Sequence, residues 1–86
     1  MYAVNLSNKA QKGYKTYTEY RTQFQTVLTL LETNSHPFHT FDLAKLKGLP
    51  DSYRIRIGKM RIKYRIIAES KTIVVFYIGP RETAYD

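Results

Sequence analysis

Cations alternate with apolar residues along two neighbouring segments in the second half of the sequence. The segments are Tyr53-Arg54-Ile55-Arg56-Ile57 and Met60-Arg61-Ile62-Lys63-Tyr64-Arg65-Ile66. A period of two predicts β-strands with apolar side chains on one face and charged side chains on the other. Arginine binds phosphate oxygens through a planar fork of N–H donors, and its charge stabilises negative charge that develops on a phosphate in a transition state. The pattern therefore predicts a phosphate-binding face suited to RNA.

The Gly58-Lys59 pair suits a two-residue hairpin turn with glycine first, and such a turn sets the register of the two strands. The facing pairs are then Ile57–Met60, Arg56–Arg61, Ile55–Ile62, Arg54–Lys63 and Tyr53–Tyr64, with Arg65 beyond them. Like charges in direct opposition destabilise a strand pair, and no acid within the two segments relieves them. Protection of an edge strand from aggregation would explain one or two lysines. It explains poorly five cations in register, four of them arginine, so we interpret this face as functional.

The charge of the whole chain supports the same interpretation. The net charge is +7, and between Lys45 and Arg65 eight cations stand against the single acid Asp51. A concentrated basic segment suits phosphate, anionic lipid or an acidic protein partner. The longest apolar stretch, from Ile73 to Ile78, is too short to span a bilayer, and the N-terminus does not read as a leader peptide. We therefore expect no membrane association and a cytoplasmic protein.

Metal and thiol chemistry is not expected. The sequence has no cysteine, which excludes disulfides, thiolate zinc sites and cysteine nucleophiles. His36 and His39 have only Asp42 near them in sequence, which falls short of a zinc ligand set. We therefore expect neither a metal nor another cofactor.

The first half of the sequence predicts a short strand followed by helices. Tyr2 to Leu6 suits a strand, and Ser7 can cap a helix that begins near Asn8 and that Gly13 ends or weakens. Thr16 and Glu19 have the spacing of a capping box, which predicts a second helix from Tyr17, although a single helix bent at Gly13 stays possible. The buried stripe of this helix would be Tyr17, Tyr20, Phe24, Val27, Leu28 and Leu31. Residues 36–50 read as an irregular connection.

The elements together predict an α+β fold. Glu69-Ser70-Lys71 suits a turn, and Thr72 to Ile78 is apolar on both faces, as a central strand would be. Helices followed by an antiparallel meander pack in two layers, with the apolar face of the sheet on the long helix. We expect a single domain over residues 1–86.

Three runs of residues resemble the RelE/ParE toxin superfamily. The runs are Lys45-Leu46-Lys47-Gly48, the segment from Asp51 to Arg65, and Val74-Val75-Phe76-Tyr77-Ile78-Gly79-Pro80-Arg81 with Tyr85 near the end. The resemblance implies two helices on a four-stranded, mostly antiparallel sheet, with the first strand beside the last and a short C-terminal tail. It also implies a toxin that a cognate antitoxin holds silent in a toxin–antitoxin hetero-oligomer. The RelE branch enters the ribosomal A site and cuts mRNA without a metal, by attack of a ribose 2′-hydroxyl on the adjacent phosphate.

The resemblance assigns roles to individual residues. Arg61 and Arg81 match the arginines that stabilise the phosphorane, and Tyr85 matches a C-terminal tyrosine that orients or stacks on the substrate. Arg54 and Arg56 stand where the ribosome-dependent nucleases often carry lysines, and an arginine cannot act as a base. The candidates for the general base are Lys63, whose arginine neighbours favour its neutral form, and then Tyr85 and Glu82. The residues predicted to bind RNA are Arg54, Arg56, Arg65, Lys45 and Lys47.

Two other functions remain open from the sequence. The missing lysine pair favours a ParE-like toxin that inhibits DNA gyrase by binding and cuts nothing. A decayed toxin, kept for its contacts with an antitoxin, is the third possibility.

Overall fold

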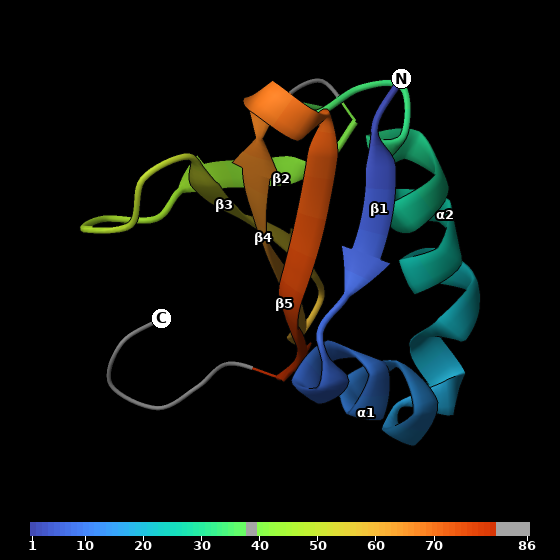
Figure 1. The fold of residues 1–86 in the computed structure, drawn as a ribbon. Coiled ribbons are helices and arrows are strands. Elements are labelled where there is room, and N and C mark those ends of the chain that lie inside the picture. The colour runs from blue at the N-terminus through green and yellow to red at the C-terminus, as the bar shows by residue number, and fades with distance from the viewer. Residues whose placement is uncertain (38–39, 81–86) are drawn as a thin grey trace.

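A five-stranded sheet forms the centre of the molecule, and two helices pack against it (Figure 1). The computed structural model describes residues 1–37 and 40–80 of the 86-residue chain. The elements are β1 (Ala3–Leu6), α1 (Asn8–Thr16), α2 (Arg21–Leu31), β2 (Asp42–Lys45), β3 (Ser52–Ile57), β4 (Met60–Ile67) and β5 (Thr72–Pro80), with single 3₁₀ turns η1 (Thr18–Tyr20) and η2 (Ala68–Ser70). The strand order is β1-β5-β4-β3-β2, in which only β1 and β5 are parallel. The predicted α+β class, the central last strand and the first strand beside it are confirmed.

The expectation of four strands was wrong, because residues 36–50 contain the edge strand β2. Asp42, Ala44 and Lys45 have low intrinsic preference for strands, so local sequence does not mark the segment. Pairing with β3 creates the strand: Leu43 lies opposite Ile55, and both side chains face the core.

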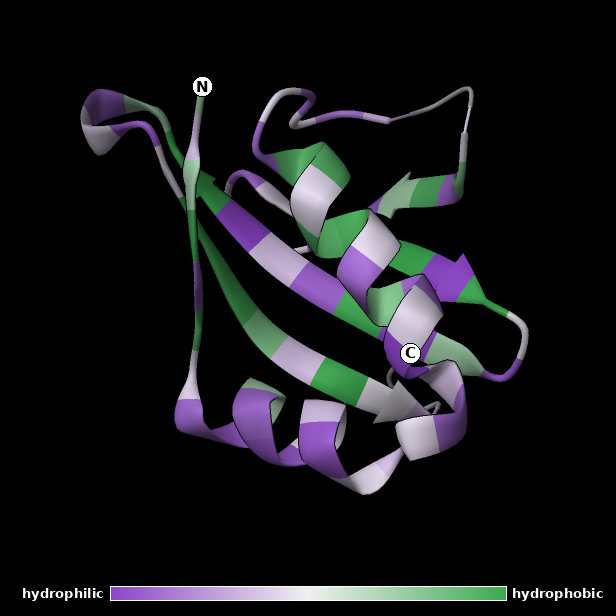
Figure 2. Cartoon of the chain, turned by 90° about the vertical axis from the view of Figure 1, so that its right-hand side faces the viewer, coloured by the Kyte–Doolittle hydropathy of each residue, from purple (hydrophilic) through white to green (hydrophobic). Residues whose placement is uncertain are grey.

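The register of the β3–β4 hairpin is the one that the turn predicts. Gly58 has a φ of +56°, which a side chain would disfavour, and Arg56 lies opposite Arg61. The Tyr53 and Tyr64 rings stack with their centroids 5.9 Å apart, as an opposed pair should. Figure 2 shows the alternation of hydrophobic and hydrophilic residues along the strands behind α2.

The start predicted for the first helix is confirmed, but its predicted end at Gly13 and the predicted start of the second helix at Tyr17 were wrong. Helix α1 runs through Gly13 to Thr16, and α2 begins at Arg21 after a 3₁₀ turn. The capping box does not form, because the Thr16 hydroxyl donates to the Lys12 carbonyl at 2.7 Å and so belongs to the end of α1. The predicted Ser7 cap is confirmed: its Oγ accepts from the Ala10 N–H at 3.1 Å.

Gly13 is where α1 touches the sheet. A Cβ atom at this position would lie 1.8 Å from the carbonyl oxygen of Ile78 in β5. Real atoms cannot approach so closely, so glycine is what allows the helix backbone to rest on the strand. The residue serves packing and does not end the helix.

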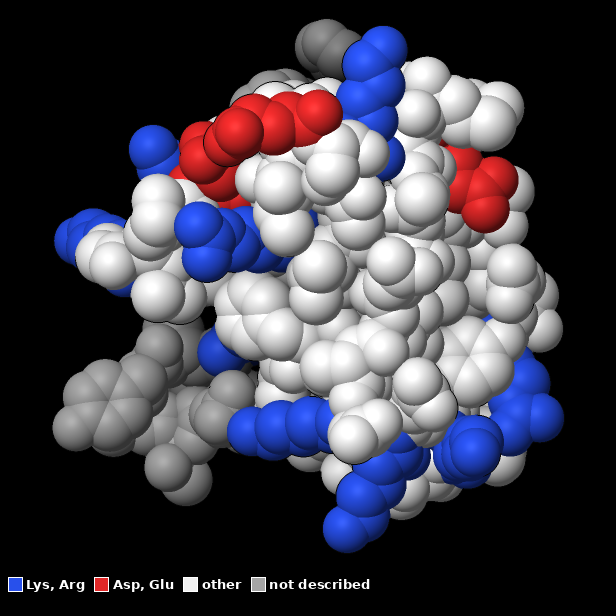
Figure 3. All heavy atoms as spheres, in the orientation of Figure 1, with Lys and Arg blue, Asp and Glu red and all other residues white. Residues whose placement is uncertain are grey.

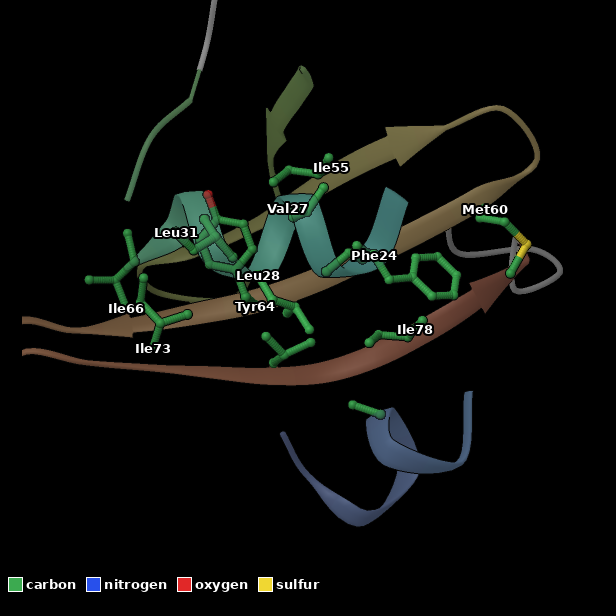
Figure 4. Close-up of a cluster of buried hydrophobic side chains, with 13 residues drawn as sticks. Phe24, Val27, Leu28, Leu31, Ile55, Met60, Tyr64, Ile66, Ile73 and Ile78 are labelled. Carbon is green, nitrogen blue, oxygen red and sulfur yellow. The ribbon is translucent and has the colours of Figure 1, made fainter. Parts of the chain in front are cut away.

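The core lies between α2 and the inner face of the sheet (Figure 4). Its fully or almost fully buried members include Phe24, Val27, Leu28, Leu31, Ile55, Ile62, Tyr64, Ile73, Val75 and Ile78. The Tyr64 hydroxyl donates to the Ser35 carbonyl at 2.7 Å. Burial, and secondarily the neighbouring Tyr53, raises the pKa of Tyr64, so its hydroxyl stays a neutral donor. Tyr64 thus ties the segment after α2 to β4.

We predict that Gly13→Ala destabilises the protein by about 1–3 kcal/mol, the usual range for overpacking. Intrinsic helix propensity alone would give a gain of about 1 kcal/mol for the same change. The free energy of unfolding in urea distinguishes the two, with Lys15→Ala at an exposed position of α1 as the control. A more stable Gly13→Ala variant would show that α1 does not depend on this close approach.

Candidate nucleic-acid interface

The alternating cations lie together on the face of the sheet that points away from α2. They are Arg54 and Arg56 on β3, and Arg61, Lys63 and Arg65 on β4. The opposite face of the same strands is buried, because Ile55, Ile62 and Tyr64 pack on the helix. We call these five residues the basic face. Core packing therefore holds them in place although they repel one another.

Arg56 has an acidic partner that the sequence analysis did not foresee. Its Nη2 atom lies 2.6 Å from Asp42 Oδ2, and its Nε–H donates to the same oxygen at 2.8 Å. Asp42 comes from β2, directly across the ladder from Arg56. The expectation of wholly unrelieved charge was therefore wrong here. Because both side chains are about half exposed, at 49% and 48%, the pair contributes about 0–1 kcal/mol.

Arg54 is placed differently from Arg56. Its Nη1 atom is buried, and within residues 1–37 and 40–80 it has no hydrogen-bond partner. A buried N–H donor of a charged group is costly when unsatisfied, and a phosphate oxygen is the kind of acceptor that satisfies it. Arg54 also lies opposite Lys63, so two cations meet at this point of the sheet.

Lys63 lies inside the basic face. Only 7% of its surface is exposed. Its neighbour across the β4–β5 ladder is Tyr77, and the Lys63 Nζ atom lies 5.1 Å from the centroid of the Tyr77 ring. The Lys9 Nζ atom of α1 lies 5.1 Å from the centroid of the same ring. An aromatic face attracts an ammonium group, so Tyr77 holds two of the lysines.

The other predicted site residues are only partly brought together. Arg61 lies opposite Gly79 at the end of β5, and Arg65 lies opposite Ser52. Lys45 lies opposite Tyr53, on the helix side of the sheet, so it does not join the basic face. Lys47 is exposed in the loop after β2. The candidates Arg81, Glu82 and Tyr85 lie outside the described residues, as does His39.

Sequence reasoning missed Tyr77, Lys9 and Asp42. The sequence analysis treated residues 72–78 as apolar on both faces and so did not predict that Tyr77 faces outward. This orientation depends on a β-bulge in the β4–β5 pair between Lys63 and Tyr64. One signal was available for Lys9: the first eighteen residues contain no acid.

The described residues were also searched for a histidine site, a metal-ligand cluster and a membrane-spanning helix. His36 packs edge-on against the Tyr53 ring, with centroids 4.8 Å apart. No group of three or more metal-ligating side chains gathers within residues 1–37 and 40–80. In the same ranges, neither helix has the length and apolar character needed to cross a membrane.

Residues 4–85 match the family model of the ParE toxin of type II toxin–antitoxin systems. The chain belongs to the ParE toxin family. The match covers nearly the whole chain, including the helical first half that carries no signature of its own. Membership of the RelE/ParE superfamily, which the sequence motifs predicted, is therefore confirmed.

This ParE-family chain is also similar to proteins of the RelE branch. It is 38% identical over 63 residues to a protein named RelE1 from Methanocaldococcus jannaschii, covering 73% of this chain and 70% of that protein. The toxin in the RelE–RelB complex of Pyrococcus horikoshii is 30% identical, with a TM-score of 0.78 over 96% of this chain and 98% of that one. The Escherichia coli RelBE complex shares the fold, with a TM-score of 0.79, 24% identity, and 95% and 99% coverage. The chain is thus a RelE-like toxin of the type II class.

We predict different effects on stability for the two arginines of β3, because only Arg56 has an acidic partner among the described residues. Arg54→Gln removes a cation that faces Lys63, so it should leave stability unchanged or raise it by about 0.2–1 kcal/mol. Arg56→Gln removes the partner of Asp42, which costs about 0–1 kcal/mol, and also removes the cation that faces Arg61, which gains about 0.2–1 kcal/mol. Its stability should therefore stay close to that of the wild type. Thermal unfolding at low and high salt measures both, and salt should shrink both differences. A marked loss of stability in Arg54→Gln at low salt would reveal a favourable partner for Arg54.

Proposed function

We propose that this toxin is a ribosome-dependent mRNA endonuclease that a cognate antitoxin holds inactive. The observation that carries the proposal is the Arg54–Lys63 pair, in which a buried guanidinium N–H without a described partner faces a second buried cation. Two cations kept in opposition lower the stability of the free protein, and a bound phosphodiester would relieve both. RNA is the phosphodiester favoured by similarity to RelE proteins.

The proposed reaction uses the RNA's own nucleophile. The ribose 2′-hydroxyl attacks the adjacent phosphorus, the P–O2′ bond forms and the P–O5′ bond breaks. The products are a 2′,3′-cyclic phosphate and a 5′-hydroxyl end. The 2′-hydroxyl proton passes to a base and the 5′-oxygen takes up a proton, so the reaction needs no oxidant, reductant or bound cofactor.

We propose individual roles from the resemblance and, for the described residues, from their position and charge. Arg61, at the edge of the basic face beside the end of β5, would stabilise the phosphorane together with Arg81. Arg54, Arg56 and Arg65 would hold the RNA backbone through phosphate contacts. Lys63, between Arg54 and Tyr77, stays the first candidate base, with Tyr85 and Glu82 as alternatives.

The basic face is the proposed target of an antitoxin. The RelE chains of Pyrococcus horikoshii and Escherichia coli are seen in complexes with RelB. We propose that the cognate antitoxin of this chain brings an acidic or amphipathic segment onto the basic face or displaces the C-terminal tail. Binding there would neutralise the charges that RNA needs and would form the toxin–antitoxin hetero-oligomer.

Inhibition of DNA gyrase is the second candidate. The matching family model is that of ParE toxins, and Arg54 and Arg56 replace the lysines often found in ribosome-dependent nucleases. A gyrase inhibitor would act by binding alone, so its basic face would contact protein and cut nothing.

The test of the proposed function is a purified translation system in which the ends of the mRNA are mapped. We expect cuts only in the presence of ribosomes, with 2′,3′-cyclic phosphate ends. EDTA-treated toxin, added to ribosomes in their normal magnesium, should cut equally well. Cuts with 3′-hydroxyl ends would contradict the mechanism. If the mRNA stays intact and the toxin inhibits the supercoiling of DNA by purified gyrase, the second candidate function replaces the proposed nuclease function.

We predict that Arg61→Ala and Arg81→Ala each lower the rate of cleavage by about 10²–10³-fold, the usual effect of removing a group that stabilises charge in the transition state. Lys59→Ala is the matched control, because Lys59 is exposed in the hairpin turn and has no proposed role. Growth arrest in cells and cleavage rates in the purified system provide the measurements, at equal expression and with unfolding checked. Full toxicity of both arginine variants would remove their assigned roles.

A further inference from the structure

Helix α1 concentrates positive charge in a way that works against its own stability. The first eighteen residues contain Lys9, Lys12 and Lys15 and no acid. Lys9 stands in the first turn, where the helix dipole repels cations. Lys9 and Lys12 are three residues apart, so they also repel each other. An arrangement that is unfavourable twice over suggests that these charges serve a ligand.

Lys9 and Lys12 border a recess of about 210 Å³ between α1 and the end of β5. Thr16 continues the same edge of the helix, and the rings of Tyr17 and Tyr77 form part of the wall. Gly79 keeps this wall in shape, because a Cβ at this position would lie 3.0 Å from the Tyr77 hydroxyl oxygen and 3.6 Å from the Tyr17 ring. The recess thus combines two ammonium groups, a hydroxyl and aromatic surface.

Tyr77 joins this recess to the basic face. Its ring lies between the two groups of cations, with the Lys9 Nζ and the Lys63 Nζ each 5.1 Å from the ring centroid. Its hydroxyl donates to the Pro80 carbonyl, which anchors the end of β5. In Figure 3, Lys and Arg side chains gather at the lower edge of the molecule, where α1 lies, and acidic side chains lie in the upper half. Tyr77 therefore brings a lysine of α1 and a lysine of β4 to the same aromatic ring.

We propose that Lys9 and Lys12 form a second phosphate-binding subsite, which holds an RNA backbone phosphate while the half-buried Tyr17 ring contacts the adjoining sugar or base. The inference rests on the proposed function and adds to it a binding site on the helix. Ammonium groups bind phosphate as point charges, and aromatic rings beside them accept any base. That combination favours RNA over an acidic peptide, which offers carboxylates and no bases. The phosphate belongs either to mRNA or to ribosomal RNA.

Lys12→Gln and Lys15→Gln make a matched pair, because they remove the same charge from exposed positions of the same helix, three residues apart. Only Lys12 borders the recess. The three variants Lys9→Gln, Lys12→Gln and Lys15→Gln are each titrated with a single-stranded RNA oligonucleotide and, separately, with mRNA-free small ribosomal subunits. Both titrations are repeated over a range of salt concentrations. For Lys9→Gln and Lys12→Gln we expect the slope of log affinity against log salt to become shallower by about 0.7 per lost contact on single strands. Lys15→Gln should keep the wild-type slope.

The two ligands distinguish the sources of the phosphate. A shallower slope with the oligonucleotide assigns the subsite to mRNA, and a shallower slope with the subunits alone assigns it to ribosomal RNA. Equal slopes for Lys12→Gln and Lys15→Gln with both ligands overturn the subsite. Poly-glutamate serves as a third ligand. If Lys9→Gln and Lys12→Gln weaken the binding of poly-glutamate but leave the binding of RNA unchanged, the subsite is overturned in favour of an acidic protein partner.

Failure of the proposed function has a different signature. Wild-type protein that binds neither ligand refutes both the function and the subsite. Wild-type binding that Arg54→Gln weakens, but that Lys9→Gln and Lys12→Gln leave unchanged, refutes only the subsite. Unfolding midpoints of the lysine variants that equal the wild-type value, and a midpoint of Arg54→Gln that is no lower, ensure that the comparison concerns binding.

Discussion

Packing of one face of the β3–β4 hairpin on α2 imposes like-charge opposition on the other face. Ile55, Ile62 and Tyr64 are fully buried against the helix. Burial of each large apolar side chain contributes about 1.5–3 kcal/mol, whereas a like-charged pair costs about 0.2–1 kcal/mol. A slip of the register by one residue would separate the charges but would turn the apolar side chains out to water. The core therefore decides the register, and the basic face is its consequence.

The strands on either side of the hairpin moderate this repulsion. On the β2 side, Asp42 pairs with Arg56 near the surface. On the β5 side, the Tyr77 ring holds Lys63 and, from the helix, Lys9. Between them the Nη1 atom of Arg54 stays without a partner among the described residues. Two cations of the basic face thus have a favourable neighbour, and under the proposed function the Arg54 donor is left for a ligand.

The fold alone does not choose between the two proposed functions. One fold can carry unrelated activities, because function depends on the side chains of the site. Under the resemblance to ribosome-dependent nucleases, which often carry lysines at these positions, Arg54 and Arg56 could not act as bases but could bind phosphate through two N–H groups. Binding and stabilisation of phosphate therefore remain within the reach of this face, and the identity of the proton acceptor becomes the deciding question.

The sequence by itself determined the features that depend on neighbours along the chain. The period of two predicted β3 and β4, the Gly58-Lys59 turn predicted their register, and the apolar run predicted β5 as a central strand. The helical spacing of Phe24, Val27, Leu28 and Leu31 marked the core. These signals are local, because side-chain direction alternates with a fixed period once a strand or helix forms.

Only the tertiary structure decided what depends on the packing of distant segments. Local propensity argued against β2, and the strand exists because β3 offers it a partner. The sequence predicted that Gly13 ends or weakens the first helix. In the structure, Gly13 instead allows α1 to pack against the carbonyl of Ile78. Lys45 shares the basic composition of its segment but faces the other side of the sheet. The contacts of Tyr77 with Lys9 and Lys63 join the first helix to the last two strands. No local period along the chain predicts a contact between segments so far apart.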